Sequence, residues 1–259
     1  MSSLSLPVLV TQFRSITDSS KDEASTYLKK HNYRLDAAVD AYYQASTDSS
    51  ASPQKIATIF DQYKDSDGDN IGVDGTIRWC ADLGVDPEDV ALLAVACELK
   101  SPTVGEWTRS GFTDGWKKLG CDTIPAMKAK IDQLRTKLSQ DPAYFSKVYN
   151  YTFTFAKGEG ARSISIETAI AYWTLLLDIG LSGPALPHAG WKEEYTQWWF
   201  EFLNEKGGKG ISKDTWTMLP DFIKTIDSKF ENHDLEAAWP STIDDFVDWA
   251  KEKIQAGQA

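Results

Sequence analysis

Helical periodicity runs through most of this chain and limits the folds that it can form. From Gln54 onward, apolar residues recur every three or four positions, and Gly, Pro, Asp or Ser separates successive runs. That spacing places apolar side chains on one face of a helix. Residues 151–155 alternate between polar and apolar, but the end of a helix is as consistent with them as a strand. The sequence therefore predicts an all-α fold.

Ten helices are expected in this long region. With 42% hydrophobic and 12% aromatic residues, the 259-residue chain has enough apolar surface for a substantial core. A chain of this size buries about 75% of the surface that its unfolded form exposes. The predicted helices cover residues 54–64, 73–83, 87–100, 109–118, 122–139, 141–156, 166–178, 191–206, 212–231 and 241–254.

A smaller unit is predicted at the N-terminus, over residues 6–45. Three short helices fit its pattern, with Asp18 as a breaker and cap between the first two. Such a bundle needs small side chains where its helices cross, and Ala24 and Ala38 can supply them. About 40 residues is close to the lower size limit for a domain that folds alone.

The Ser-rich segment 46–53 predicts a flexible linker, because it is small, polar and without apolar periodicity. The larger helical domain would then span residues 54–256. The Pro/Gly-rich segment 181–190 is expected to be an exposed loop inside that domain.

The acidic composition limits the partners. The formal net charge is −11 and the isoelectric point is about 4.8, which argues against nucleic-acid binding and favours basic protein partners. No run of apolar residues approaches the length of a membrane span, and the N-terminus has no signal-peptide pattern. We expect a protein of the cytoplasm and nucleus.

Motifs of enzyme chemistry are absent from the sequence. Cys80, Cys97 and Cys121 have no C-x-x-C spacing and are expected to be buried, reduced thiols. The three His residues lie in no recognisable catalytic pattern, and no phosphate-binding or nucleophile-elbow motif occurs. The sequence therefore predicts no catalytic residue, no cofactor and no resident metal.

One loop resembles a calcium-binding EF-hand. Asp65, Asp67 and Asp69 occupy the first three ligand positions, but Thr76 stands where the bidentate Glu is required. A second candidate, residues 158–167, keeps a short apolar strand and lacks the early acids. The two loops predict EF-hand-like architecture without strong calcium binding. A calcium sensor is one candidate function that these loops raise.

Residues 236–252 combine an apolar face with clustered acids. Ser241 is expected to cap a helix, with Asp244 in a capping-box-like position. Ile243, Phe246, Val247 and Ala250 then form an apolar face, and the acids at 244, 245, 248 and 252 project elsewhere. The acids have two possible roles: they complement the helix dipole, or they form a surface for a basic partner.

The N-terminal string Tyr27-Leu-Lys-Lys-His-Asn-Tyr-Arg-Leu-Asp-Ala-Ala-Val-Asp-Ala-Tyr-Tyr43 resembles the last part of a ubiquitin-associated (UBA) domain. The usual Met-Gly-Phe/Tyr motif of its first loop is replaced by Ile16-Thr-Asp18. A generic three-helix bundle is the alternative for this segment.

Several strings together resemble the defective-in-cullin-neddylation family, in which a UBA domain precedes a helical potentiating-neddylation (PONY) domain built on EF-hand-like units. The resemblance covers residues 6–254 in order. The strings that carry it are Ile71-Gly-Val-Asp-Gly75, Asp86-Pro87, Phe112-Thr-Asp-Gly115, Leu119-Gly-Cys-Asp122, Phe153-Thr-Phe-Ala-Lys157, Ala169-Ile-Ala-Tyr-Trp173, Lys213-Asp-Thr-Trp216, Ala238-Trp-Pro240 and Ile243-Asp-Asp-Phe-Val247.

The resemblance implies a scaffold-type, non-catalytic ligase component for cullin neddylation. Such a protein holds the neddylation conjugating enzyme and a cullin together, so that the ubiquitin-like modifier passes to a cullin lysine. The gain is proximity and orientation. The alternative is a ubiquitin-binding adaptor that acts through the UBA-like domain without ligase activity.

The resemblance also implies two sets of site residues. The family's contact with the C-terminal region of the cullin falls on Asp214, Ala238 and Asp244. An apolar pocket that takes the acetylated N-terminus of the conjugating enzyme falls on Val73, Leu92, Val95, Ala96, Leu99, Trp107, Phe155, Tyr172 and Leu175. Without the family, all nine read as ordinary core residues.

Overall fold

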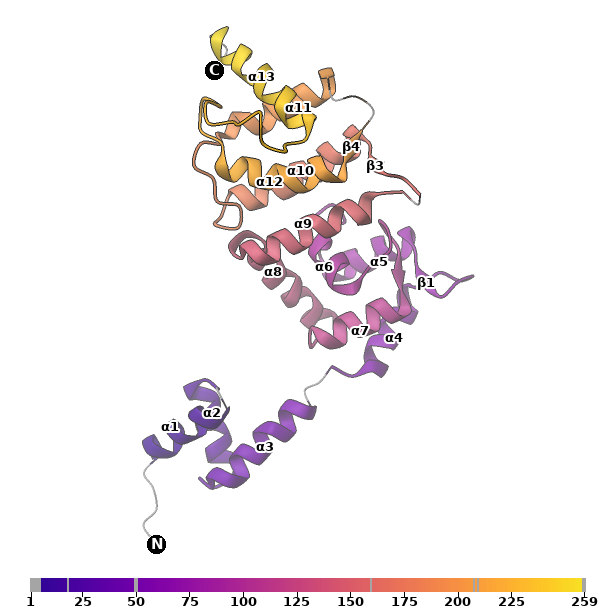
Figure 1. Ribbon diagram of the computed structural model, residues 1–259. Helices are drawn as coiled ribbons and strands as arrows, with labels where there is room; N and C mark the ends of the chain where they lie inside the picture. Colours follow the sequence, from indigo (N-terminus) through magenta and orange to yellow (C-terminus); the bar gives the residue numbers. More distant parts are fainter. Residues whose placement is uncertain are drawn as a thin grey trace.

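The computed structural model describes residues 6–17, 19–48, 51–158, 160–206, 208 and 210–257. These residues form thirteen helices and four two-residue strands, so the all-α prediction is confirmed (Figure 1). Buried apolar side chains fall into two separate clusters, one within the first three helices and one within the rest. No helix in the described part of the chain is long and apolar enough to cross a membrane.

The N-terminal bundle is built around one aromatic side chain. Its helices are α1 (Leu6–Thr17), α2 (Lys21–Lys30) and α3 (Leu35–Asp48). Phe13 is fully buried, and its ring lies 6.2 Å from that of Tyr27 and 5.6 Å from that of Tyr42. Ala24 and Ala38 are also fully buried, as their expected place at the helix crossings requires. The predicted breaker Asp18 lies outside the described residues.

The segment between the two clusters differs from the predicted linker 46–53. Helix α3 continues to Asp48, because neither Gly nor Pro interrupts the chain before Pro53. Ala51 is only 3% exposed and belongs to the main core. The side chain of Ser52 then caps α4 by accepting from the backbone N–H of Lys55. The composition of the segment does not reveal that Ala51 is buried in the core or that Ser52 caps a helix.

All ten helices predicted for the larger region are present. The alternating residues 151–155 lie within α9, so the helical alternative is the correct one there. The helix predicted over 212–231 ends at Thr225, because Ile226 is extended, with φ −69° and ψ 139°. The observed bounds are α4 (Pro53–Tyr63), α5 (Val73–Leu83), α6 (Ala91–Leu99), α7 (Arg109–Lys118), α8 (Ile124–Gln140), α9 (Pro142–Ala156), α10 (Ile166–Leu181), α11 (Glu193–Lys206), α12 (Lys213–Thr225) and α13 (Ser241–Gln255).

Four short strands join the helices in pairs, as EF-hand-like units do. β1 (Asn70–Ile71) pairs antiparallel with β2 (Trp107–Thr108), and β3 (Ser163–Ile164) pairs antiparallel with β4 (Ile211–Ser212). Each strand leads directly into a helix, so the pattern helix–strand–helix occurs four times. The sequence predicted the loops that hold β1 and β3. It missed their partners, because two residues are too few to show strand periodicity.

Two of the three acids of the first EF-hand-like loop, Asp65 and Asp69, make contacts within the protein. Asp65 accepts a hydrogen bond from the backbone N–H of Gly72 across 3.2 Å. The Arg109 guanidinium lies 2.6 Å from Asp69 and 2.7 Å from Asp61. Within the described residues, no three His, Cys, Asp or Glu side chains are grouped so that they could hold a metal ion.

The segment after α10 is only in part the exposed loop that its Pro and Gly residues predict. Ala185 and Leu186 are buried, and their backbone N–H groups donate to the carbonyls of Ser139 and Gly180. Gly183 allows the close approach, because a Cβ there would lie 2.3 Å from the Ser139 carbonyl oxygen. These contacts fix the segment against the end of α8.

Candidate functional site

Asp214, Ala238 and Asp244 come from three different parts of the C-terminal region. Asp214 is in the first turn of α12, Ala238 is in the segment between α12 and α13, and Asp244 is in the first turn of α13. Asp214 and Ala238 line one groove of about 420 Å³, together with Trp239, Pro240 and the start of α13. We call this groove and the adjoining Asp244 the Asp-Ala-Asp surface.

Asp214 is presented by a well-capped helix end. The Ser212 side chain caps the helix by accepting a hydrogen bond from the backbone N–H of Thr215 across 3.1 Å. Asp214 is exposed, and no cation among the described residues pairs with it. A carboxylate is favoured in the first turn of a helix, because the backbone N–H groups there carry partial positive charge. The charge of Asp214 is therefore free to act on a partner.

Ala238 is exposed because the backbone turns sharply around it. The N–H of Trp239 donates to the carbonyl of Ala237 across 2.8 Å. Trp239 is half-buried and packs on the core, whereas Ala238 faces solvent at the edge of the groove. A methyl group at this position leaves room for another protein to approach the backbone.

The start of α13 corrects one sequence prediction. Pro240 is the N-cap residue, and Ser241 is the first residue of the helix and makes no side-chain cap. Asp244 closes no capping box, because its carboxylate accepts a hydrogen bond from outside the helix. The donor is His233 Nε2, 2.8 Å from Asp244 Oδ1. The predicted apolar face is confirmed, since its four residues are fully buried.

A cluster of three aromatic rings connects the parts of the surface. His233 lies edge-on to Phe222 of α12, with ring centroids 5.8 Å apart, and its ring centroid is 5.9 Å from that of Trp239. Phe222 and Trp239 also meet edge to face, at 5.9 Å. The helix that carries Asp214, the turn that carries Ala238 and the helix that carries Asp244 are therefore linked through one aromatic cluster.

The nine predicted pocket residues differ in how far they are buried. Val73 is 62% exposed and lies against Gly105, where an added Cβ would be 3.0 Å from Val73 Cγ2. Tyr172 and Leu175 are half-buried, and the Phe155 and Tyr172 rings meet edge to face at 6.4 Å. The other six are buried in the core: Leu92, Val95, Ala96, Leu99, Trp107 and Phe155. The assignment of these nine to a peptide pocket stays a prediction.

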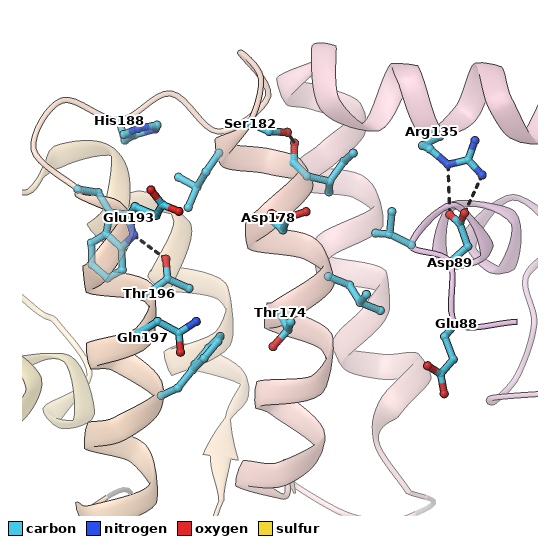
Figure 2. Close-up of a pocket in the computed structure, with 16 residues that line it drawn as sticks. Glu88, Asp89, Arg135, Thr174, Asp178, Ser182, His188, Glu193, Thr196 and Gln197 are labelled. Atoms are coloured by element: carbon cyan, nitrogen blue, oxygen red, sulfur yellow. Dashed lines mark hydrogen bonds and ion pairs between the residues drawn. The ribbon is translucent and has the colours of Figure 1, made fainter. Parts of the chain in front are cut away.

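A larger cavity of about 750 Å³ lies between α10 and α11. Figure 2 shows Thr174 and Asp178 of α10 facing Thr196 and Gln197 of α11, with Ser182 at the end of α10 and His188 above them. Leu175 is the one predicted pocket residue that lines it. The Asp89–Arg135 ion pair, 2.8 Å long, closes the far side. Sequence reasoning did not find this cavity, because its walls come from segments far apart in the chain.

The three thiols are poorly suited to nucleophilic catalysis. Cys80, Cys97 and Cys121 are free and buried. Burial raises the pKa of Cys80 and of Cys97 to about 11, and it also raises the pKa of Cys121. The thiolate is the reactive form, and it is scarce at neutral pH when the pKa is raised.

Comparison with known proteins identifies the family of the chain. The family model for cullin binding matches residues 126–249, which include the Asp-Ala-Asp surface, and the model for a UBA-like domain matches residues 8–49. The chain is 40% identical to defective in cullin neddylation protein 1 of Cryptococcus neoformans, over 95% of this chain and 94% of the relative.

Two further relatives extend the similarity. Defective in cullin neddylation protein 1 of Mycosarcoma maydis is 34% identical, over 96% of this chain and 95% of its own. DCN1-like protein 3 of Rattus norvegicus is 35% identical over 83% of this chain and 68% of its own. With this similarity over nearly its whole length, the chain belongs to the defective-in-cullin-neddylation family.

Proposed function

We propose that this protein is a co-ligase in cullin neddylation. Membership of the family and the match to the cullin-binding model support this role. The protein would hold a cullin and the neddylation conjugating enzyme in a productive orientation. Holding two reactants in place raises their effective concentration and removes much of the entropic cost of their encounter.

The observation that carries the proposal is the Asp-Ala-Asp surface. Asp214 has no cation partner among the described residues, Ala238 leaves space beside it, and Asp244 is held on the neighbouring helix. Two carboxylates beside a small residue fit a basic segment of the cullin's C-terminal region. The net charge of −11 would also speed the approach of such a segment.

The conjugating enzyme is the proposed second partner, bound through its acetylated N-terminus. The nine residues from Val73 to Leu175 would form the binding pocket. Their apolar character favours an uncharged terminus, because a free ammonium group would lose its hydration without gaining a counter-charge. Binding would require side chains of the pocket to move, since six of the nine are buried.

The chain would contribute no catalytic group of its own. All three thiols are buried, with raised pKa values, which supports transfer of the modifier directly from the conjugating enzyme to the cullin. Such a co-ligase acts by binding alone. We expect it to act in both cytoplasm and nucleus.

A reconstituted neddylation assay with limiting conjugating enzyme tests this function. The test variant carries Asp214→Lys, Ala238→Arg and Asp244→Lys. The control carries the same change in net charge elsewhere, through Asp67→Lys, Ser110→Arg and Asp114→Lys. The native protein and the control should accelerate cullin modification, and the test variant should not, although its circular dichroism stays helical. Equal rates with all three proteins would overturn the proposal.

A ubiquitin-binding adaptor remains the second candidate function. The family model places a UBA-like domain at residues 8–49, and its bundle exposes the large apolar side chains of Leu6, Val8, Ile16 and Tyr33. Exposed apolar surface of this kind is common at protein-binding sites. Titration of labelled ubiquitin, followed by NMR, tests it: chemical-shift changes on ubiquitin support the adaptor, and unchanged spectra exclude it.

A further inference from the structure

We propose that His233 is a positioning residue, which holds the carboxylate of Asp244 in the orientation that receives a basic cullin side chain. This inference rests on the proposed function of the Asp-Ala-Asp surface. It assigns a role to a residue that neither the sequence motifs nor the apolar periodicity identified.

The contact between the two side chains is short and protected. His233 Nε2 lies 2.8 Å from Asp244 Oδ1, and the imidazole is 1% exposed, whereas Asp244 is 28% exposed. An ionised carboxylate only accepts hydrogen bonds, so Nε2 carries the proton and donates it. The histidine therefore occupies Oδ1 from the buried side. The exposed part of the carboxylate remains available to a partner.

The imidazole packs against two aromatic rings, which also contact each other. Phe222 packs edge-on to it, and Trp239 lies against it at an interplanar angle of 36°. A side chain confined in this way has little freedom left to lose when a partner binds. Its hydrogen bond then restricts the rotation of Asp244, which would otherwise turn freely on an exposed helix end.

The backbone before His233 is also fixed. Asp227 accepts hydrogen bonds from the N–H groups of Lys229 and Asn232, at 2.7 and 2.6 Å. The Asn232 side chain in turn accepts from the N–H of Asp227 and donates to the carbonyl of Thr225. Phe230, within this turn, has a φ of +60° and is fully buried. The hydrogen bonds of the turn that follows α12 thus fix the position of the His233 backbone.

The chemistry of the donor matters as much as its position. A Lys or Arg at residue 233 would form an ion pair with Asp244 and cancel the charge that attracts a basic partner. In its neutral form, an imidazole donates a hydrogen bond and leaves that charge in place. A pre-oriented acceptor binds more tightly, because the complex no longer bears the cost of ordering the side chain.

The test measures binding of a purified cullin C-terminal region by calorimetry. His233→Phe keeps the ring packing and removes the donor, and His233→Gln places an amide N–H near the position of Nε2. We expect His233→Phe to weaken binding about three- to tenfold and His233→Gln to retain most of the affinity. His188→Phe, at an exposed histidine outside the surface, is the control and should bind like the native protein.

A double-mutant cycle separates positioning from general structural damage. If His233 acts through Asp244, His233→Phe should have no further effect on a protein that already carries Asp244→Asn. An equal loss in both backgrounds would overturn the proposal, as would native affinity of His233→Phe. If His233→Phe lowers the melting temperature too far for calorimetry, His233→Met fills the same space more adaptably and takes its place in the cycle.

Asp214→Asn distinguishes this proposal from the proposed function. If Asp214→Asn and Asp244→Asn both bind the cullin normally, the surface is not the cullin contact, and both proposals fail. If both weaken binding while His233→Phe does not, the cullin contact stands and the positioning role of His233 is rejected.

Discussion

Tyr149 and Trp216, 67 residues apart in the chain, exchange two hydrogen bonds. The Tyr149 hydroxyl donates to the carbonyl of Trp216 across 2.8 Å, and Trp216 Nε1 donates to the carbonyl of Tyr149 across 3.0 Å. Trp173 Nε1 donates to the same hydroxyl across 2.7 Å, and its ring stacks on Trp216 at 4.9 Å. Helices α9, α10 and α12, the last of which carries Asp214, are therefore joined at one buried point.

Tyr149→Phe should destabilise the protein by about 1–3 kcal/mol, because it leaves the Trp173 N–H and the Trp216 carbonyl without their buried partner. Urea unfolding measures this change. Tyr172→Phe is a matched control, because no hydrogen bond is found for the Tyr172 hydroxyl among the described residues. It should stay within about 0.5 kcal/mol of the native protein. Equal effects of the two substitutions would contradict the assigned role of Tyr149.

Gly75→Ala should destabilise the first EF-hand-like unit by about 1–3 kcal/mol or more. A Cβ at Gly75 would lie 2.1 Å from the backbone oxygen of Tyr63 and 2.8 Å from a methyl group of Ile71. Helix α5 could then no longer pack closely against the end of α4. Gly68→Ala, where the nearest atom is 4.0 Å away, should be close to neutral in the same thermal unfolding experiment. A neutral Gly75→Ala would show that the two helices separate easily.

The contacts of Asp122 should stabilise the protein at neutral pH and be lost in acid. It accepts a hydrogen bond from the backbone N–H of Ser52 across 3.1 Å and lies 3.4 Å from Lys55 Nζ. The hydrogen bond from Ser52 and then the charge of Lys55 hold the pKa of Asp122 below its usual value. Because the folded-state pKa is the lower one, this stabilisation is fully present above about pH 4 and is lost as the pH falls through the folded-state value.

Asp122→Asn should therefore be less stable than the native protein at pH 7, and the difference should shrink in acid. Urea titrations at pH 7 and pH 3 measure it. Asp114→Asn removes an exposed carboxylate with no hydrogen-bond partner in the described part of the chain, and it should change little at either pH. If Asp122→Asn lowers the free energy of unfolding equally at pH 7 and pH 3, the proposed pH dependence is wrong.

Acetylation should strengthen binding of the conjugating enzyme's N-terminal peptide at least tenfold. Desolvation of a free ammonium group costs several kcal/mol, and about 1.4 kcal/mol corresponds to a factor of ten in affinity. Calorimetry with acetylated and unacetylated peptides gives the ratio. The variant Asp214→Lys, Ala238→Arg, Asp244→Lys shares no residue with the predicted pocket and should give the same ratio. Equal affinity for the two peptides would remove the pocket hypothesis.

Much of the fold could be predicted from the sequence, because helix periodicity is a local signal. The apolar face of α13 is an example, and it is confirmed. The pairing of Ile71 with Trp107 could not be predicted in this way, since a two-residue strand has no period of its own. The buried state of Ala51 was also missed, because it depends on contacts with distant residues and not on composition.

The candidate site shows the same division. The family motifs indicate Asp214, Ala238 and Asp244, but not His233. The role of His233 depends on a turn after α12 and on two aromatic neighbours, none of which follows from spacing. Ser241 was predicted to cap α13 from local sequence. The prediction failed because the helix begins one residue earlier, with Pro240 as its N-cap. The carboxylate of Asp244 is instead hydrogen-bonded to His233, which the local sequence does not reveal.

The place of Trp239 gives the protein an optical reporter at its proposed partner surface. Of the ten tryptophans, eight are buried, and only Trp239 and Trp249 are half-buried. Trp239 is adjacent to Ala238 and lines the same groove. The eight enclosed indoles would emit a nearly constant background, while the emission of Trp239 would change as a bound cullin displaces water from it. Intrinsic fluorescence could thus follow the association in real time, without any attached dye.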